Sequence, residues 1–484
     1  MYCGWRYHDS AGQAGRVIYS DAFGHRELTR RLATRARAGK RIARVKTPIT
    51  MSTRSIVVVG AGNAAGYLVR ALVSHGLGNK TTVIGAEDVA PYERPALTKG
   101  FLHAQNPPRL PGFHTCVGGG GERQTPEWYA ENGVELKLST TVTSVDFAAK
   151  KVTTNAGESI GYETLVLATG CGVIRLPAAM GGELPGVRYV RDNADGLALA
   201  AALETAKKAA VIGGGYIGLE VAASCATRGL KPEVIMMEPH VMGRLWNADI
   251  AKHYEALYEA RGATFHRSSK VKDIVAGADG AASGVRLESG ETINADLVVV
   301  GIGATAPVPF EGLDAPEGRV GGVKVDARFR ASGPAVEPGS VYAIGDIAAF
   351  PLKLTGETVR LEHVKHARDS AAYVGDLIAG KTPAEYDPTP YFYSRVFEHP
   401  GTERAVNWVF YGVQTADEII TIGDLNPKLA AFWIKGDKCV GVMLESGAAE
   451  HVSALAAAVR SGKSIDVAAL RAAASADDAI SLIL

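Results

Sequence analysis

Two glycine patterns in the chain have the spacing of a turn that binds phosphate. They are Gly60-x-Gly62 followed by Ala65, and the complete Gly213-x-Gly215-x-x-Gly218. In such a turn the first glycine permits the tight bend and the second lets the backbone approach a pyrophosphate, whose charge the N-terminus of the next helix attracts. A glycine turn alone is weak evidence, because it can also be purely structural.

An acidic residue stands at the expected distance behind each pattern. Glu87 follows the apolar run of "TTVIGAED", and Glu238 follows that of "PEVIMME", where each second strand is predicted to end. A carboxylate there accepts a hydrogen bond from the ribose of a dinucleotide. Glu238 would also repel a 2′-phosphate, which favours NADH over NADPH, although the nearby Arg244 could soften that preference.

Apolar runs place both patterns between a strand and a helix. Residues 56–59 and 209–212 are typical of buried parallel strands, and apolar residues with helical spacing follow each turn. Two more apolar strands, in "YETLVLATG" (162–170) and "ADLVVVGIG" (295–303), close the two units. Two fingerprints, each inside a strand–helix–strand unit, argue against structural turns and predict an α/β chain that binds two dinucleotides.

A single carboxylate, Asp346, stands in "SVYAIGDIAAFP" (340–351), behind another predicted strand. At a strand-to-helix junction such a carboxylate needs a partner. A ribityl hydroxyl of a flavin would serve, and so would the N-terminus of a helix that Asp346 caps. Both interpretations are compatible with each other.

The composition limits the class of protein. A chain of 484 residues is expected to form roughly two to four domains, and its formal charge of +1 argues against a nucleic-acid binder or a polybasic membrane partner. No apolar run reaches membrane-spanning length. The five cysteines form no Cys-x-x-Cys or Cys-x4-Cys pair, so we expect neither a disulfide framework nor a zinc or other metal site.

The first fifty residues differ from the rest of the chain. They hold nine arginines and two lysines against three acidic residues, without hydrophobic periodicity. One interpretation is a transit segment, which would direct the protein to a chloroplast or mitochondrion. The other is an upstream extension, in which case Met51 is the natural start and the protein is cytoplasmic.

The two fingerprints, "ATG" (168–170) and "GDIAAFP" (345–351) together resemble the flavoprotein pyridine-nucleotide oxidoreductases. This resemblance implies that the first unit binds FAD, the second binds NAD(P)H, and a C-terminal domain covers the flavin. The implied fold is α/β, with two Rossmann-like dinucleotide-binding domains and a C-terminal α+β domain. The expected segments are an N-terminal extension at 1–53, a discontinuous FAD domain at 54–185 and 309–385, an NAD domain at 186–308, and a C-terminal domain at 386–484.

The segment after the first unit selects a branch of this family. Disulfide reductases carry Cys-x4-Cys there, whereas this chain has "APYERPALTKGFL" (90–102) without cysteine. That excludes disulfide exchange and the peroxide and oxygen reductases that use one cysteine, and "YERPALTKG" resembles the ferredoxin-reductase-like branch. Within it, "RLEHVKHARDSAAYV" (360–374), "YFYSRVF" (391–397) and "WVFYG" (408–412) resemble the monodehydroascorbate reductases.

The resemblance also implies roles for single residues. Arg368 would bind the ascorbate radical, and Tyr393 would lie between that substrate and the flavin ring. The residues implied to hold FAD are Gly60, Gly62, Ala65, Glu87, Arg94, Lys99, Thr169, Gly170, Arg191, Asp346, Glu362, His363 and Val364. Those implied to hold NADH are Gly213, Gly215, Tyr216, Ile217, Gly218, Glu220, Glu238, Arg244 and Gly303.

The residue patterns by themselves leave plainer interpretations open. Arg368 falls on a predicted helix with an apolar face, where a solvated surface arginine is the default. His363 and His366 would be ordinary polar positions, and Tyr393 would be a core tyrosine of a strand. Residues 398–407, which follow that strand, look like an insertion relative to the family.

The implied activity is NADH-dependent reduction of the monodehydroascorbate radical to ascorbate through FAD, with a hydride taken in and two single electrons passed out. No general base is required, because the radical takes an electron and then a solvent proton. The alternative is an NAD(P)H-dependent reductase of a ferredoxin- or rubredoxin-type carrier protein. We expect a small-molecule substrate, no nucleic-acid partner, no membrane span, and a monomer or weak homo-oligomer.

Overall fold

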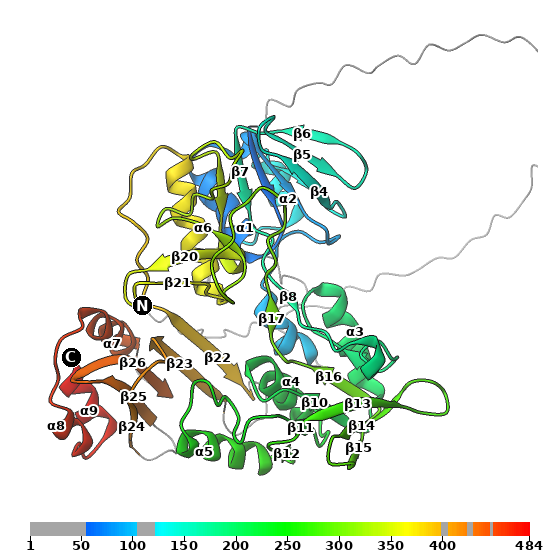
Figure 1. Cartoon of the computed structure of the whole chain (residues 1–484), viewed down its shortest axis with the longest axis vertical. Helices are drawn as coiled ribbons and strands as arrows, with labels where there is room; N and C mark the ends of the chain where they lie inside the picture. The colour runs from blue at the N-terminus through cyan, green and yellow to red at the C-terminus, as the bar shows by residue number, and fades with distance from the viewer. Residues whose placement is uncertain (1–54, 104–121, 398–404, 424–428, 446–448) are drawn as a thin grey trace, which may run out of the picture. The chain divides into compact units, whose positions relative to one another are not determined.

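The computed structural model describes residues 55–103, 122–397, 405–423, 429–445 and 449–484 (Figure 1). The predicted N-terminal extension lies outside the described residues, and so does most of the predicted insertion at 398–407. No helix within the described ranges is long and apolar enough to span a membrane.

The first glycine turn belongs to a five-stranded parallel sheet in the order β19-β7-β1-β2-β3. Its strands are β1 Ile56–Val59, β2 Thr81–Ile84, β3 Glu135–Lys137, β7 Thr164–Leu167 and β19 Val341–Ala343. β1 is buried along its whole length, as its run of one isoleucine and three valines predicts. β19 pairs with β7 although the whole second unit lies between them in the sequence, so this sheet is assembled from two separate parts of the chain.

Two helices pack together against this sheet: α1, Asn63–Ser74, and α6, Val364–Ile378. The predicted apolar face of α6 is buried at Ala367, Ala371 and Val374. A Cβ added to Gly375 would lie 2.6 Å from the Cβ of Ala71, so the two helices approach closely at this point. The side chains at the N-terminal end of α6 are thereby placed beside α1.

The second glycine turn belongs to another five-stranded parallel sheet, in the order β12-β11-β10-β16-β9. Its strands are β9 Val187–Arg188, β10 Ala209–Ile212, β11 Glu233–Ile235, β12 Thr264–His266 and β16 Leu297–Val300. The accompanying helices are α3 Asn193–Thr205, α4 Tyr216–Thr227 and α5 Ala248–Glu259. The two parallel sheets therefore repeat one architecture, as the two fingerprints predict.

The C-terminal part is an antiparallel sheet in the order β22-β23-β26-β25-β24. Its strands are β22 Tyr391–Val396, β23 Val406–Gly412, β24 Glu418–Ile422, β25 Leu429–Lys435 and β26 Lys438–Glu445, and three helices follow, α7 Ala449–Ser461, α8 Val467–Arg471 and α9 Ala476–Ile483. One set of its side chains packs on these helices, and another set, which includes Trp408 and Trp433, joins a core with residues of α4 and α5. This arrangement leaves β22 at the edge of the sheet.

Shorter elements complete the described chain. They are β4 Val142–Asp146, β5 Lys151–Thr154, β6 Ser159–Gly161, β8 Gly172–Val173, β13 Val271–Ala276, β14 Ala282–Leu287, β15 Thr292–Asn294, β17 Ala304–Thr305, β18 Val323–Lys324, β20 Ala348–Leu352, β21 Glu357–Val359, α2 Pro126–Glu131, and the 3-10 turns η1 Gly78–Lys80, η2 Arg94–Thr98, η3 Gly100–Leu102, η5 Ala178–Met180 and η6 Gly345–Ile347. The predicted α/β fold class is confirmed, whereas the domain boundaries stay predictions.

The prediction of a strand-to-helix junction at Asp346 is wrong. Asp346 lies in η6, and strand β20 follows directly. The N-cap position of η6 is Ile344, and no side chain caps this turn, so Asp346 is not a capping aspartate. The apolar run after Asp346 was compatible with a helix or a strand, and its pairing with β18 and β21 decided for the strand.

Candidate active site

The glycine turns of both units are too tight for another residue. Gly60 has a φ of +107° and Gly213 a φ of +117°, in the region that L-residues avoid. A Cβ on Gly60 would lie 2.3 Å from the carbonyl oxygen of Ala168, and a Cβ on Gly213 would lie 2.3 Å from that of Gly301. Each turn therefore passes over the end of the neighbouring strand, β7 or β16, at backbone distance.

Helices α1 and α4 begin at these turns with open N-termini. Their N-cap residues are Gly62 and Gly215, so no side chain caps the first N–H groups, and neither first turn contains an acidic residue. The positive end of each helix can therefore attract an anion. A Cβ on Gly215 would meet no atom within 4 Å, which leaves room for a phosphate close to the backbone. Both turns fit the pyrophosphate of a dinucleotide.

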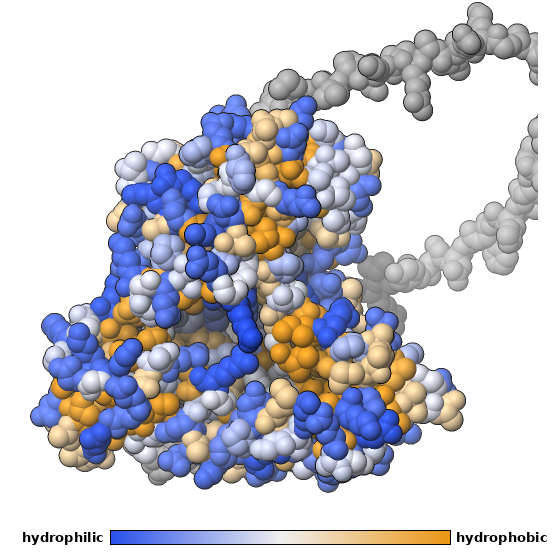
Figure 2. Space-filling model, in the orientation of Figure 1, coloured by the Kyte–Doolittle hydropathy of each residue, from blue (hydrophilic) through white to orange (hydrophobic). Residues whose placement is uncertain are grey.

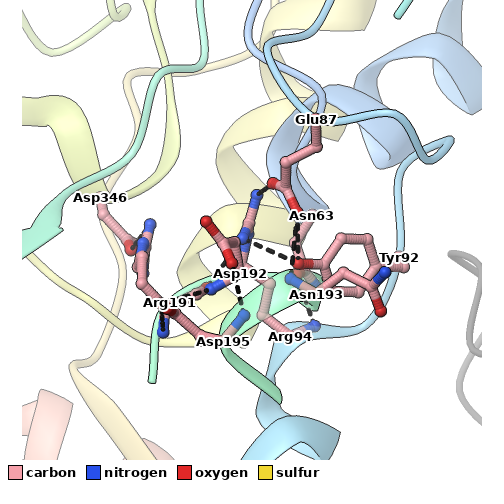
Figure 3. Close-up of polar contacts among 9 residues, drawn as sticks. All are labelled: Asn63, Glu87, Tyr92, Arg94, Arg191, Asp192, Asn193, Asp195 and Asp346. Carbon is pink, nitrogen blue, oxygen red and sulfur yellow. Dashed lines mark hydrogen bonds and ion pairs between the residues drawn. The ribbon is translucent and has the colours of Figure 1, made fainter. Parts of the chain in front are cut away.

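Glu87 is the centre of a polar cluster behind the first turn (Figure 3). Its carboxylate pairs with Arg94 and accepts hydrogen bonds from the Tyr92 hydroxyl at 2.7 Å and the Asn193 backbone N–H at 3.2 Å. Burial raises the pKa of Glu87, but the Arg94 charge and these hydrogen bonds outweigh it and hold the pKa below its ordinary value. Glu87 is thus a buried, fixed anion at the predicted ribose position.

Asp346 and Arg191 face each other at the other end of this cluster (Figure 3). The guanidinium of Arg191 lies 3.6 Å from the Asp346 carboxylate, and its backbone oxygen accepts a hydrogen bond from Arg94 at 2.9 Å. A Cβ on Gly170 would lie 2.6 Å from Nη2 of Arg191, so this guanidinium covers the end of β7. The structure therefore brings together four residues that the resemblance assigned to FAD and that come from different parts of the chain: Glu87, Arg94, Arg191 and Asp346.

Glu220 connects three parts of the chain. It lies buried on α4 and pairs with Lys99 at 2.8 Å. The hydroxyl of Ser394 on β22 donates to it at 2.6 Å, and that of Thr98 donates as well. A buried carboxylate needs such partners, because desolvation without them is costly. Glu220 therefore links the first unit, the second unit and the C-terminal sheet through one carboxylate.

Arg368 is half-buried on α6 and does not have the environment of a solvated surface arginine. Its Nη2 lies 3.2 and 3.4 Å from the two carboxylate oxygens of Glu93, and its guanidinium lies 4.9 Å from the centre of the Tyr67 ring. The Nε of Arg368 is buried and has no hydrogen-bond partner among the described residues. The guanidinium is thus held on one edge by the first unit.

His363 fastens strand β22 to the start of α6. Its Nε2 lies 3.2 Å from both the backbone oxygen and the backbone nitrogen of Tyr393, and its Nδ1 accepts the N–H of Lys365 as the N-cap of α6. Because Nδ1 accepts, the proton of the neutral ring is on Nε2, so that Nε2 can donate to the Tyr393 oxygen and cannot accept the Tyr393 N–H at the same time. Burial lowers the pKa of His363 to about 4, so the ring is neutral at neutral pH.

The aromatic residues of β22 point to its two faces in alternation. Phe392 stacks on Tyr216 of α4 with ring centres 3.7 Å apart, on the same face as Ser394. On the other face, Tyr391 packs edge-on against His363 at 5.1 Å. Burial raises the pKa of Tyr391, and the charge of Arg368 acts to lower it. Through His363, the N-cap residue of α6, the structure places β22 at the start of the helix that carries Arg368.

The acid of the second unit is much less enclosed. Glu238 is partly exposed, and among the described residues no side chain pairs with it. The prediction that the second strand ends at Glu238 is wrong, because β11 stops at Ile235 and Glu238 lies in the segment that follows. Arg244 is exposed nearby.

Large apolar side chains are exposed around the second turn. Met237 is 66% exposed, Ile217 41%, Ile174 40% and Ile302 38%. Figure 2 shows an apolar patch over the region where β8, β17 and β16 meet in Figure 1. Ile174 directly follows β8, and Ile302 lies between β16 and β17. Such side chains can cover a flat ring, so this surface fits the bases of a dinucleotide.

Three further predicted residues are also located by the structure. Thr169 and Glu362 are exposed, and Glu362 pairs with Arg360 at 2.5 Å. Gly303 has a φ of +119° just after β16. His366, which the sequence left as an ordinary position, is buried and stacks on Phe350 at 5.0 Å. The described part of the chain contains no cluster of acidic, histidine or cysteine side chains that could hold a metal.

Comparison with known proteins agrees with this geometry along most of the chain. Residues 54–371 match the pyridine nucleotide-disulphide oxidoreductases, and residues 389–475 match the C-terminal domain of monodehydroascorbate reductase 3-like proteins. Monodehydroascorbate reductase 5 of Oryza sativa subsp. japonica is 45% identical over 434 residues, which cover 89% of this chain and 87% of the relative. The chloroplastic/mitochondrial monodehydroascorbate reductase of Arabidopsis thaliana is 44% identical over 464 residues, or 94% and 92% of the two chains.

The chain belongs to the monodehydroascorbate reductase family. The resemblance stated from the sequence is confirmed. Among solved structures, a putidaredoxin reductase in covalent complex with putidaredoxin superposes with a TM-score of 0.76 at 25% identity, covering 86% of this chain and 95% of that one. A ferredoxin reductase from Rhodopseudomonas palustris gives 0.71 at 28% identity, covering 82% and 92%.

Membership of the family makes the protein an FAD-dependent oxidoreductase and implies a flavin and a nicotinamide cofactor. The residues at the first turn fit the flavin dinucleotide: a glycine cradle that any Cβ would fill, an open helix N-terminus, and a fixed acid behind them. The second turn has the same cradle and open helix.

Several residues of the site were missed from the sequence. Glu93, Tyr92 and Ser394 carry no fingerprint of their own, and Asn193 contributes only a backbone N–H. One signal was present for Glu93: it stands between Tyr92 and Arg94 in a segment already assigned to the flavin. Nothing in the sequence relates it to Arg368, because the two are 275 positions apart.

Proposed function

We propose that this protein uses NADH, through bound FAD, to reduce the monodehydroascorbate radical to ascorbate. The observation that carries the proposal is the C-terminal match at 389–475. This segment supplies β22, which His363 joins to the start of α6, the helix that carries Arg368. The segment of the first unit that would carry a catalytic cysteine pair, residues 90–102, has none. Disulfide exchange is therefore excluded as the chemistry.

The proposed substrate is small, oxygen-rich and anionic at neutral pH. Arg368 is permanently cationic, and a planar guanidinium suits an enolate-like anion. Its Nε has no hydrogen-bond partner among the described residues, and its side chain is 35% exposed, so Arg368 would bind the ligand while it stays paired with Glu93. Tyr393 would offer a ring and a hydroxyl beside that anion. The bound flavin would supply what no side chain does, the conversion of a two-electron hydride into single-electron steps.

The remaining residues of the site would hold the cofactor and keep β22 in place. Glu87, Arg94, Arg191 and Asp346 would hold the dinucleotide part of FAD, since they converge from separate segments on the first turn. Lys99 and Glu220 form a neutralised pair between that turn and β22. His363, neutral at neutral pH, would keep β22 in place without adding charge to the substrate region.

For the nicotinamide cofactor we propose NADH over NADPH. Glu238 follows the second strand of the second unit, where a carboxylate would bind a ribose 2′-hydroxyl and repel a phosphate. Its freedom from other side-chain partners in the described residues leaves it available for that contact. Met237 beside it would cover the adenine.

An assay with purified protein tests the proposal directly. Ascorbate oxidase generates the radical from ascorbate, and the loss of NADH is followed by its absorbance. We expect radical-dependent NADH oxidation by the flavin-loaded protein. If FAD is bound and the radical does not accelerate NADH oxidation, the proposal is wrong.

The carrier-protein alternative is tested in the same experiment. It is favoured only by the likeness to ferredoxin reductases, at 25–28% identity, against 40–45% for most of the monodehydroascorbate reductases compared. Replacing the radical by a [2Fe–2S] ferredoxin should give little NADH oxidation. Faster NADH oxidation with the ferredoxin than with the radical would contradict the proposed function and favour the reductase of a carrier protein.

For the compartment we propose a transit segment at residues 1–50 as the first possibility to test. Relatives of this chain have chloroplastic, cytosolic and peroxisomal in their names, so the family does not decide the compartment. N-terminal sequencing of the native protein should reveal a start downstream of residue 1 and other than Met51, whereas a start at Met51 would favour the upstream extension. A native chain that begins at Met1 would contradict both cleavage and a start at Met51.

A further inference from the structure

Glu93 is a buried carboxylate that the proposed function leaves without a role. It is 3% exposed and lies just before η2. The amide of Asn63 donates to its Oε2 at 2.8 Å, and the hydroxyl of Tyr67 donates to its Oε1 at 2.5 Å. Both partners come from α1 and lie one turn apart, so the carboxylate is fixed against the N-terminal part of this helix.

The third partner of this carboxylate is Arg368. Nη2 of Arg368 lies 3.2 Å from Oε1 and 3.4 Å from Oε2. The guanidinium therefore contacts both carboxylate oxygens through one of its nitrogens. The Tyr67 ring lies under the same guanidinium, 4.9 Å from its centre. Glu93 and Tyr67 thus restrict the guanidinium from the edge and from the face.

This arrangement differs from an ordinary surface ion pair. The carboxylate of Glu93 is 4% exposed, whereas the Arg368 side chain is 35% exposed. The anion therefore cannot move toward the cation, and only the arginine can adapt. Because two α1 donors already share the negative charge of Glu93, the carboxylate holds Arg368 without fully neutralising it. Among the described residues the Nε of Arg368 has no hydrogen-bond partner, so this edge of the guanidinium is the one that an external anion would contact.

The same cluster reaches the phosphate end of the first unit. Asn63 is the first residue of α1, and its side-chain oxygen accepts the backbone N–H of Arg94 at 3.2 Å. Arg94 in turn holds Glu87. The position of Arg368 is therefore set by residues next to the first glycine turn, Gly60–Gly62, although Arg368 itself belongs to α6.

We propose that Glu93 is the positioning residue of the substrate arginine: held by Asn63 and Tyr67, it fixes the guanidinium of Arg368 for an anionic enediol-type substrate. The inference rests on the proposed function, in which Arg368 binds that substrate. It predicts that Glu93 acts through Arg368 alone and not on the nicotinamide half of the reaction.

Glu93→Gln is the first test, because it keeps the shape and removes the charge. The new amide would also set its N–H groups against the donors Asn63 or Tyr67. We expect the KM for the radical and the Kd for ascorbate to rise about tenfold, which corresponds to the weakening of one charge-assisted hydrogen bond. The rate of flavin reduction by NADH should not change. Titration calorimetry with ascorbate gives the Kd independently of turnover.

Asp369→Asn is the matched control. Asp369 is the carboxylate next to Arg368 on α6, but it pairs with Lys365 at 2.5 Å and is exposed. Its substitution removes the same charge from the same helix and should leave both constants within about twofold, as for most exposed pairs. An equal rise in Asp369→Asn and Glu93→Gln would show a general charge effect and overturn the proposal.

A double-mutant cycle separates positioning from a structural role. In the Arg368→Ala background, Glu93→Gln should add no further loss of ascorbate binding, because its effect passes through the missing guanidinium. A full additional loss would overturn the proposal, as would an unchanged KM and Kd in Glu93→Gln alone. If Glu93→Gln does not fold, Tyr67→Phe removes one donor to Glu93 and should raise the Kd about threefold.

The design keeps this inference distinct from the proposed function. A wild-type protein that binds ascorbate in a Glu93-dependent way, yet does not reduce the radical, would refute the proposed function and support the role of Glu93. A wild-type protein that neither binds ascorbate nor reduces the radical would refute both.

Discussion

The two nucleotide units have the same backbone turn but differ in the surroundings of the acidic residue behind it. Gly60 and Gly213 make the same turn, each with a carbonyl oxygen 2.3 Å from where a Cβ would be. Behind the first turn Glu87 is enclosed by Arg94, Tyr92 and the start of α3. Behind the second, Glu238 has no side-chain partner in the described residues.

The difference indicates two kinds of cofactor site. The first unit is closed by charges that converge from several segments, which is what a permanently bound dinucleotide requires. The second has an exposed acid and exposed apolar side chains such as Met237, which a dinucleotide can cover and leave again. We therefore expect the first cofactor to remain bound during turnover and the second to exchange.

Alanine at the two turning glycines should separate the units most clearly. Gly60→Ala combines a positive φ with a backbone clash, so we expect loss of flavin and of several kcal/mol of stability. Gly213→Ala should keep the flavin absorbance and lose NADH-dependent reduction. Gly215→Ala, where a Cβ has open space, is the control and should keep the fold. Flavin loss in Gly213→Ala as well would mean that the units are not independent.

Acid should weaken the flavin unit through two histidines, His363 and His366. Burial lowers the pKa of His363 from 6.5 to about 4 and that of His366 to about 3, and both lie at the start of α6. Between pH 6.5 and 4 the unfolded chain binds more protons, so the free energy of unfolding falls as pH falls, by about 3 kcal/mol for His363 over the full window. Thermal unfolding and flavin release at pH 7 and pH 5 measure this.

His363→Asn checks the acid effect. Asparagine can still cap α6 but does not titrate. Its stability should depend less on pH than that of the wild type, even if it is lower at pH 7. An unchanged pH dependence would show that other groups are responsible.

Arg368→Ala should affect the second half of the reaction alone. Loss of a charge-assisted contact of about 1.5–3 kcal/mol corresponds to a drop of about 10- to 150-fold in kcat/KM for the radical. Reduction of the flavin by NADH, measured in a stopped flow without radical, should stay nearly the same. Equal loss in both half-reactions would remove Arg368 from the substrate site.

The smallest expected effect is a change of cofactor preference on substitution of Glu238, the acidic residue behind the second turn. Glu238→Ala should narrow the preference for NADH over NADPH by about tenfold, because it removes one hydrogen bond to the ribose and one repulsion of the 2′-phosphate. Steady-state kcat/KM with each cofactor measures the ratio. Arg244→Ala is the opposite change and should widen it. A ratio that stays constant in Glu238→Ala would show that another residue reads the ribose.

Much of the first unit could be predicted from local sequence. The strand at 56–59, the turn at Gly60 and the helix on which Arg368 lies were all predicted from apolar spacing and glycine. The partners of these residues could not be predicted. Glu93 carried no pattern of its own, and Asp346 was assigned to a helix junction because an apolar run has no period that distinguishes a short strand.

The sequence alone determined the two nucleotide units, the missing cysteine pair and the family. These features are local, because a positive φ demands glycine and a buried strand demands an apolar run wherever they occur in the chain. The tertiary structure alone decided which charges meet. The pair of Arg368 with Glu93 exists because α6 packs on α1, and the contact of His363 with β22 exists because the C-terminal sheet lies at the start of that helix. Both unite segments that no spacing in the sequence relates, since charge pairing depends on distance in space.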